Sequence, residues 1–118
     1  MENLKSDCIF CKIIKGELPS AKIYEDEYVL VFKDIQPQAE VHMIMIPKTH
    51  IASLNEITED FCEYLIKIHL GIQKSAESAG VYDKGYRIIS NCGKGAGQTV
   101  DHLHYHIIAG SGLNEKIT

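Results

Sequence analysis

The chain has 118 residues and a mass of 13.2 kDa, which suffices for one domain, residues 1–118, and is too little for two. Twelve basic and sixteen acidic residues give a net charge of −4, which argues against a protein that coats nucleic acid or an anionic membrane, since both attract a basic face. No apolar run approaches the ~20 residues of a membrane span, and the first residues lack the apolar core of a secretory signal. We therefore expect a cytoplasmic enzyme or binding domain with no nucleic-acid or membrane partner.

Of the four cysteines, Cys8 and Cys11 form a C-x-x-C pair. Three interpretations of the pair are open: a redox couple, two unrelated thiols on a helix, or half of a zinc site. The redox interpretation is the weakest, because no strand precedes the pair as it does in a βαβ redox motif. A zinc site needs two more ligands, and His50 and one histidine of the region 102–106 are available. Cys62 lies among apolar helix positions, which predicts a small buried side chain.

The first half of the chain predicts a short helix followed by strands. Asp7 or Ser6 can cap a helix over residues 8–15. A loop over residues 34–40 precedes a strand that ends at Pro47, which cannot donate to a sheet ladder. Segments rich in β-branched and aromatic residues predict the strands themselves: 21–25, 28–32 and 42–46.

The second half of the chain predicts one long helix and two further strands. Thr58 can cap the helix, and Gly80 suits its C-terminal end. Strands are expected over residues 86–90 and 100–108, with a glycine-rich loop over 91–98 between them. These elements together predict an α+β fold, in which a mostly antiparallel sheet carries the long helix on one face. Apolar residues recur in the helix at helical spacing: Phe61, Leu65, Ile68, Ile72 and Ala76.

Three of the six histidines alternate with apolar or aromatic residues in one short stretch, at His102, His104 and His106. On a strand these side chains would share one face, while Leu103 and Ile107 would face a core. Three imidazoles on one face favour either a metal site or a histidine nucleophile that attacks phosphorus. Neighbouring side chains on that face lie ~6–7 Å apart, which is awkward for three ligands of one ion but allows two.

The glycine-rich loop directly before the histidines favours phosphate chemistry. Backbone N–H groups of such a loop can converge on an anion, and Asn91, Gln98 and Thr99 can add side-chain hydrogen bonds. The loop is not a Walker motif, because Lys94 precedes the second glycine and no Gly-Lys-Ser/Thr ends it. Glycine clusters alone usually mark turns, so the position of the loop is what gives it weight.

The pattern His102-Leu103-His104-Tyr105-His106 followed by two isoleucines resembles the signature of the histidine triad superfamily. The similarity to the branch of histidine triad nucleotide-binding proteins covers roughly residues 7–110. It implies a five-stranded antiparallel sheet with one long helix and a short N-terminal helix, a homodimer, and hydrolysis of purine nucleoside phosphoramidates or related nucleotide esters. The similar stretches are 8–16, 32–35, 42–51, 86–91 and 97–100.

The resemblance also implies the roles of individual residues. His104 would attack the α-phosphorus to give a nucleotidyl-histidine, His106 would bond to the phosphate, and His102 and His42 would complete the catalytic group. Asp34 would hold the ribose hydroxyls. The implied phosphate positions are Asn91, Gly97, Gln98 and Thr99. The implied walls of the base pocket are Ile9, Phe10, Ile13, Phe32 and Ile35.

In the related galactose-1-phosphate uridylyltransferases, two cysteines, a mid-chain histidine and the first triad histidine bind zinc. The matching positions here are Cys8, Cys11, His50 and His102, so the resemblance implies a structural zinc ion and no organic cofactor. His102 would then orient the strand instead of taking part in acid–base catalysis. Two other functions stay open: a nucleotide-binding regulatory module with little turnover, and a three-histidine metallohydrolase.

Overall fold

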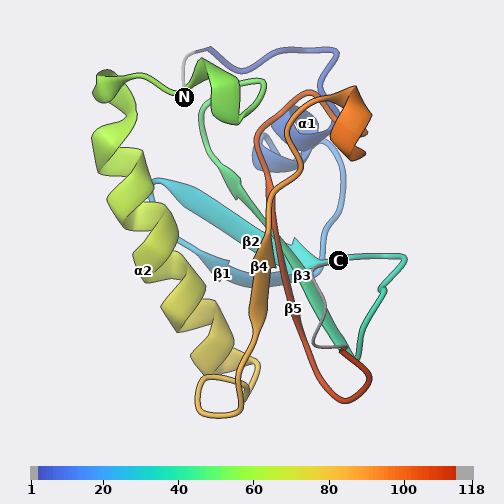
Figure 1. Ribbon diagram of the computed structural model, residues 1–118. Coiled ribbons are helices and arrows are strands. Elements are labelled where there is room, and N and C mark those ends of the chain that lie inside the picture. Colours follow the sequence, from blue (N-terminus) through green and yellow to red (C-terminus); the bar gives the residue numbers. More distant parts are fainter. Residues whose placement is uncertain (1–2, 114–118) are drawn as a thin grey trace.

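A computed structural model describes residues 3–113 of the chain. Five antiparallel strands form one sheet in the order β1-β2-β3-β5-β4, accompanied by one long and one short α-helix (Figure 1). This arrangement confirms the predicted α+β fold. The helices are α1 (Ile9–Ile14) and α2 (Cys62–Ser78), and the strands are β1 (Lys22–Glu25), β2 (Val29–Lys33), β3 (Val41–Pro47), β4 (Arg87–Ile89) and β5 (Tyr105–Ala109).

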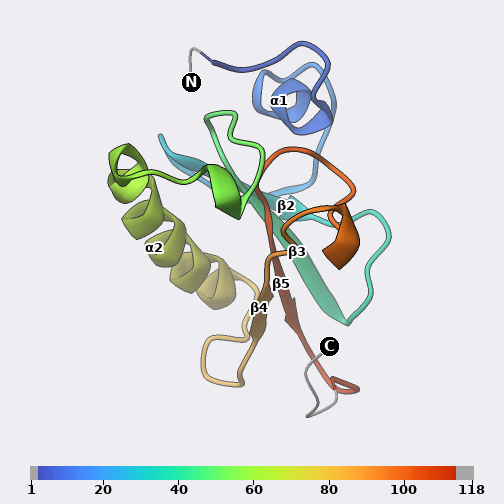
Figure 2. The same ribbon diagram turned by 45° about the horizontal axis from the view of Figure 1, so that its top comes forward.

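The two faces of the sheet carry different layers (Figures 1 and 2). Side chains alternate along a strand, so Val31 and Met45 pack with Ile68 of α2 in one cluster, whereas Phe32 and Ile46 belong to a second cluster with residues of α1. The central strands are therefore buried on both faces where α1 covers them, which explains the continuous apolar run of β2. Because α1 has only six residues, it leaves part of its face of the sheet uncovered.

Helix α2 lies unusually close to the sheet at Gly71. A Cβ atom at this position would lie 2.8 Å from Cε of Met45 and 3.1 Å from Cγ2 of Val29. Gly80 follows the helix with a φ of +74°, as expected of a C-terminal glycine. None of the helices among the described residues has the length and apolar character needed to cross a bilayer.

Three details of the predicted helices are wrong. Thr58 does not cap α2, because a 3-10 turn over Glu59–Phe61 lies between them and the Thr58 side chain makes no capping hydrogen bond. The N-cap of α1 is Cys8, whose Sγ accepts a hydrogen bond from the backbone N–H of Cys11 at 3.3 Å, in place of Asp7 or Ser6. Cys62 is exposed because it begins α2 on the side away from the sheet, although its apolar neighbours predicted burial. Helical spacing alone does not show that this position lies outside the buried stripe.

The last strand is shorter than predicted, since β5 begins at Tyr105 and not at residue 100. The segment before it leaves the sheet ladder: the backbone N–H of Leu103 donates to the carbonyl of Ile51 at 2.7 Å. His102 and His104 therefore lie on an irregular segment, and only His106 occupies a regular strand position. The three imidazoles do not line one face of a continuous strand.

The turn between β1 and β2 depends on the carboxylate of Asp26. This carboxylate accepts hydrogen bonds from the backbone N–H groups of Tyr28 and Val29 at 2.7 and 2.9 Å, and from the Tyr24 hydroxyl at 2.8 Å. Burial of the carboxylate opposes its ionisation, but these hydrogen bonds and the nearby Lys67 together hold its pKa below the usual 3.8.

We expect Asp26→Ala to lower the free energy of unfolding by about 1–3 kcal/mol, because two part-buried backbone donors lose their acceptor. The stabilisation is present above pH 3.8, the usual pKa of the group, and is lost as the pH falls through the lower pKa of the folded state. Urea denaturation at pH 7 and at pH 3 measures both effects. Glu27→Ala, at the exposed neighbouring position, is the control, and equal stability of both variants would contradict this account.

Candidate functional site

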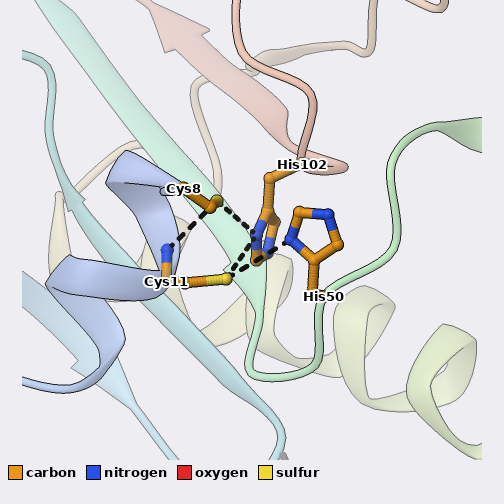
Figure 3. Close-up of side chains that lie close together, drawn as sticks. All are labelled: Cys8, Cys11, His50 and His102. Carbon is orange, nitrogen blue, oxygen red and sulfur yellow. Dashed lines mark hydrogen bonds between the residues drawn. The ribbon is translucent and has the colours of Figure 1, made fainter. Parts of the chain in front are cut away.

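Two cysteines and two histidines from three separate segments meet beside α1 (Figure 3). Sγ of Cys8 lies 3.3 Å from Nδ1 of His102, and Sγ of Cys11 lies 3.5 Å from the same atom and 3.3 Å from Nδ1 of His50. The four potential ligand atoms all lie within 4.8 Å of one another. The structure thus brings together the four residues that the resemblance implied as metal ligands.

The chemistry of these side chains fits a metal ion. Nε2–H of His102 donates to the carbonyl of Pro47 at 3.1 Å, so the lone pair of Nδ1 faces the two sulfur atoms. Burial lowers the pKa of His102 to about 4, and burial also lowers the pKa of His50, so both rings are neutral at pH 7. Two thiols and two neutral imidazoles form a donor set that suits a closed tetrahedral zinc site.

Asn3, in the N-terminal segment, holds the His50 loop in place. Nδ2 of Asn3 donates to the carbonyl of His50 at 2.7 Å. Oδ1 of Asn3 accepts hydrogen bonds from the backbone N–H of His50 at 3.0 Å and from the Thr49 hydroxyl at 2.6 Å. The N-terminal segment is therefore attached to the same loop that supplies one of the four cluster residues.

The second triad histidine, His104, has a defined tautomer. Its Nδ1–H donates to the carbonyl of His102 at 2.8 Å, which leaves the lone pair on Nε2. The ring is buried, and it meets the edge of Phe10 at 5.1 Å and the ring of His106 at 5.3 Å between centroids. An imidazole that keeps the lone pair on Nε2 can act as a nucleophile through that nitrogen.

A chain of hydrogen bonds also defines the third triad histidine. The backbone N–H of Gln38 donates to Nδ1 of His42 at 3.0 Å, so Nε2 of His42 carries the proton. That Nε2–H lies 2.9 Å from Nδ1 of His106 and 3.3 Å from Oδ2 of Asp34. Nδ1 of His106 therefore accepts, and its proton is on Nε2. Burial is the main cause that holds the pKa of His106 below its usual 6.5, and the nearby His104 and His42 lower it further.

Asp34, His42 and His106 lie close enough together to resemble a second metal site. The hydrogen bond from Gln38 argues against that use. A metal on Nε2 of His42 would place the proton on Nδ1, where it would face the N–H of Gln38 as a second donor. The geometry favours a hydrogen-bonded chain at these three residues.

The glycine-rich loop is shaped by its own hydrogen bonds. Gly93 and Gly97 have φ angles of 88° and 89°, in the left-handed region that favours glycine, on either side of a 3-10 turn over Lys94–Ala96. The backbone N–H groups of Gly97 and Gln98 donate within the loop. Nδ2 of Asn91 donates to the carbonyl of Ala96 at 2.9 Å. These groups hold the loop in shape, so only part of the predicted anion cradle is available to a ligand.

Gln98 is buried, and both ends of its amide bind backbone atoms. Oε1 accepts from the N–H of Gly93 at 2.8 Å, while Nε2 donates to the carbonyls of Ala52 at 2.7 Å and Val100 at 2.9 Å. The side chain thereby joins the glycine loop to the segment that follows His50. Thr99 is exposed and lines a depression with Cys8 and His50.

The predicted base-pocket residues divide into two groups. Phe10 and Phe32 are buried with ring centroids 5.9 Å apart, and the half-buried Ile13 packs against the same cluster. Ile9 and Ile35 are instead 49% and 94% exposed. The structure therefore brings three of the five together and leaves two isoleucines at the surface.

Several groups at the site carry no sequence signal. The carbonyls of Pro47 and His102 and the N–H of Gln38 decide which nitrogen of three rings carries the proton, but nearly every residue has such backbone groups. Asn3 was also missed, because asparagine near a terminus is an ordinary surface residue.

Comparisons with known proteins agree with this geometry. A family model described as "Scavenger mRNA decapping enzyme C-term binding" matches residues 7–117. An uncharacterized HIT-like protein of Helicobacter pylori is 44% identical over 102 residues, which cover 86% of this chain and 95% of the relative. The adenosine 5′-monophosphoramidase of Candida albicans is 42% identical over 106 residues, which cover 87% of this chain and 70% of the relative.

A solved structure of a HIT family hydrolase from Clostridium thermocellum matches with a TM-score of 0.93 and 54% identity, covering 97% of this chain and 99% of that one. The three triad histidines at the start of β5 and the five-stranded sheet place the protein in a defined class. The chain belongs to the histidine triad (HIT) superfamily.

We expect Gln98→Glu to lower the free energy of unfolding by about 1–3 kcal/mol, because the carboxylate cannot donate to the carbonyls of Ala52 and Val100. Thermal or urea denaturation measures the loss. Gln73→Glu, the same change on the exposed side of α2, is the matched control. If both variants unfold like the wild type, the Gln98 amide does not hold the loop.

Proposed function

We propose that the protein hydrolyses purine nucleoside phosphoramidates or related nucleotide esters through a nucleotidyl intermediate on His104. The observation that carries this proposal is the hydrogen bond from Nδ1–H of His104 to the carbonyl of His102, which leaves the lone pair on Nε2. Support also comes from the relatives, one of which is named an adenosine 5′-monophosphoramidase and another a HIT family hydrolase.

The reaction would proceed in two displacements at phosphorus. Nε2 of His104 attacks the α-phosphorus, the bond from phosphorus to the leaving nitrogen breaks, and the departing amine takes up a proton from solvent water, which the attacking water of the second step replaces. Water then attacks the nucleotidyl-histidine, which releases the nucleoside monophosphate and regenerates the neutral imidazole. Nε2–H of His106 would donate to a phosphate oxygen and stabilise the charge that develops there.

Positioning would come from the residues around the histidines. His42 would keep His106 in the required tautomer and orientation. Asp34, whose Oδ1 accepts from the N–H of Gln36 at 2.8 Å, would accept hydrogen bonds from the ribose hydroxyls through its other oxygen. Phe10 and the exposed Ile35 would contact the base. The loop of residues 91–99 would flank the phosphate.

We propose a structural zinc ion for the cluster of Cys8, Cys11, His50 and His102. A zinc ion there would supply a cross-link between the N-terminal segment, the loop after β3 and the segment before β5. The side chain of His102 would then be fully occupied, with Nδ1 toward the ion and Nε2–H on the carbonyl of Pro47. His102 would support catalysis only through its carbonyl.

We further propose a cytoplasmic homodimer. The four cysteines are free thiols, which suits a reducing compartment. Strand β4 is an edge of the sheet, and Ile88 on it is 37% exposed. On α2, Ile66 is 61% exposed and Leu70 is 43% exposed. A second copy paired about a two-fold axis would cover these side chains.

We expect His104→Ala to lower kcat/KM for adenosine 5′-phosphoramidate by about a thousandfold or more, as loss of a nucleophile does in other enzymes. The folded variant should still bind adenosine monophosphate, which calorimetry measures. His69→Ala, on the exposed side of α2, should retain full activity. If the wild type binds the nucleotide but does not turn over, the alternative of a nucleotide-binding regulatory module replaces this proposal.

We expect the purified protein to hold about one zinc ion per chain and Cys11→Ser to hold almost none, because the ion loses a thiolate ligand. Removal of the ion by a chelator should lower the melting temperature of the wild type. Cys62→Ser is the matched control, since Cys62 is exposed on α2 and should not change the metal content. Equal zinc content in both variants, measured by mass spectrometry of the metal, would refute the ligand set.

A further inference from the structure

The two cysteines of the cluster lie close enough to bond to each other (Figure 3). Cys8 is the N-cap of α1 and Cys11 follows three residues later, so both side chains lie on the first turn of the helix. Their sulfur atoms are among the four ligand atoms that lie within 4.8 Å of one another. Rotation about the Cα–Cβ bonds of the two side chains can close this gap to the ~2.05 Å of a disulfide without movement of the helix.

Solvent reaches this pair at Cys8. That residue is 8% exposed, whereas Cys11 is fully buried. A depression of about 380 Å³ opens beside Cys8 and is also lined by His50, Thr99 and Asp101. This volume is far larger than the ~30 Å³ of a water molecule, so hydrogen peroxide fits. A small oxidant that enters from solvent therefore meets Cys8 before Cys11.

Formation of a disulfide would change the surroundings of His102. Nδ1 of His102 lies 3.3 Å from Sγ of Cys8 and 3.5 Å from Sγ of Cys11, while its Nε2–H is used on the carbonyl of Pro47. Nδ1 is thus an acceptor for a thiol proton or for a metal ion, and a disulfide has neither to offer. The residue is fully buried, so the lone pair would be left without a partner away from water.

This change would reach the proposed nucleophile through the backbone. The carbonyl of His102 accepts Nδ1–H of His104 at 2.8 Å and thereby defines its tautomer. A His102 ring that shifts to find a new partner for Nδ1 moves this carbonyl as well, so the hydrogen bond lengthens and Nε2 of His104 loses its fixed position. A displacement of about 1 Å at a reacting group is enough to lower a rate by a large factor.

We propose that Cys8 and Cys11 are a peroxide-sensitive pair, in which a reversible disulfide removes two ligands from the cluster and lowers the activity at His104. The effect on activity rests on the proposed function, whereas the disulfide does not. No strand precedes the pair, which argues against an oxidoreductase of the βαβ type. Formation of a disulfide within one helical turn does not require that fold.

The oxidation proceeds in two steps. Hydrogen peroxide oxidises the thiol of Cys8 to a sulfenic acid and is itself reduced to water. Sγ of Cys11 then attacks Sγ of Cys8, the sulfur–oxygen bond breaks, and a second water molecule leaves with the proton of the Cys11 thiol. Where the two sulfurs hold a zinc ion as thiolates, the ion is released and two protons from solvent complete the two water molecules.

The test treats the zinc-loaded wild type with hydrogen peroxide. Trypsin places both cysteines in one peptide, residues 6–12, because it cleaves after Lys5 and Lys12. We expect mass spectrometry to find this peptide lighter by two hydrogen atoms and resistant to iodoacetamide. A chromogenic chelator should detect about one released zinc ion per chain. The value of kcat/KM for adenosine 5′-phosphoramidate should fall by about tenfold or more.

Dithiothreitol with added zinc should reverse all three changes, which distinguishes the disulfide from methionine sulfoxide, because thiols do not repair the latter. Cys62→Ser is the matched control: this exposed thiol lies outside the cluster, so the variant should respond to peroxide like the wild type. Cys11→Ser lacks the second thiol, so Cys8 should stop at the sulfenic acid, which dimedone traps. Because the peptide is also mapped in the wild type, the test does not depend on the folding of Cys11→Ser.

Two results would overturn the proposal separately from the proposed function. The first is a peptide 6–12 that still reacts fully with iodoacetamide after peroxide treatment. The second is a disulfide that forms while the zinc ion stays bound, or while a wild type that hydrolyses the phosphoramidate keeps its kcat/KM. If the untreated wild type hydrolyses no phosphoramidate, the proposed function fails, and the peptide and zinc measurements still decide whether the disulfide forms.

Discussion

His102 connects the two parts of the site through opposite ends of one residue. Its ring points into the cluster of Cys8, Cys11 and His50, while its carbonyl accepts the Nδ1–H of His104. The side chain is fully buried, and it cannot move without disturbing both contacts. The position and tautomer of the proposed nucleophile therefore depend on the packing of a cluster whose other members come from distant parts of the chain.

Backbone groups, more than side chains, decide how the histidines of the site are protonated. The carbonyl of Pro47 places the proton of His102 on Nε2, and the N–H of Gln38 does the same for His42. Nε2–H of His42 then donates to Nδ1 of His106, so the proton of His106 is on its Nε2. Each ring has one donor and one acceptor nitrogen, so one backbone contact is enough to define the chemical role of the other nitrogen.

The loops around the site form one connected structure. Gln98 joins the glycine loop to the carbonyl of Ala52, and the N–H of Leu103 donates to Ile51 only one residue away. Asn3 holds the preceding residue His50 from the other side. The segment that follows β3 is thus shared by the cluster of cysteines and histidines and by the loop proposed to flank the phosphate.

The sequence by itself determined the order and type of the elements, because hydrophobic periodicity and turn residues are local properties. It also indicated the histidine triad and the C-x-x-C pair, whose residue types are rarely placed together without a function. It placed the start of the last strand too early, since nothing local shows that Leu103 leaves the ladder to bond Ile51. Burial of Cys62 was predicted wrongly for a similar reason: its neighbours are apolar, but the direction it faces depends on where α2 meets the sheet.

Only the tertiary structure decided which nitrogen of each ring is free, and which amides of the glycine loop remain available. The composition of the loop suggested an anion cradle, yet the amide of Gln98 is used on backbone partners up to 46 positions away. Such contacts depend on the relative placement of segments that are distant in the chain, and backbone donors and acceptors are identical at nearly every position. Local sequence therefore predicts which residues can react, whereas the fold decides in which state they are held.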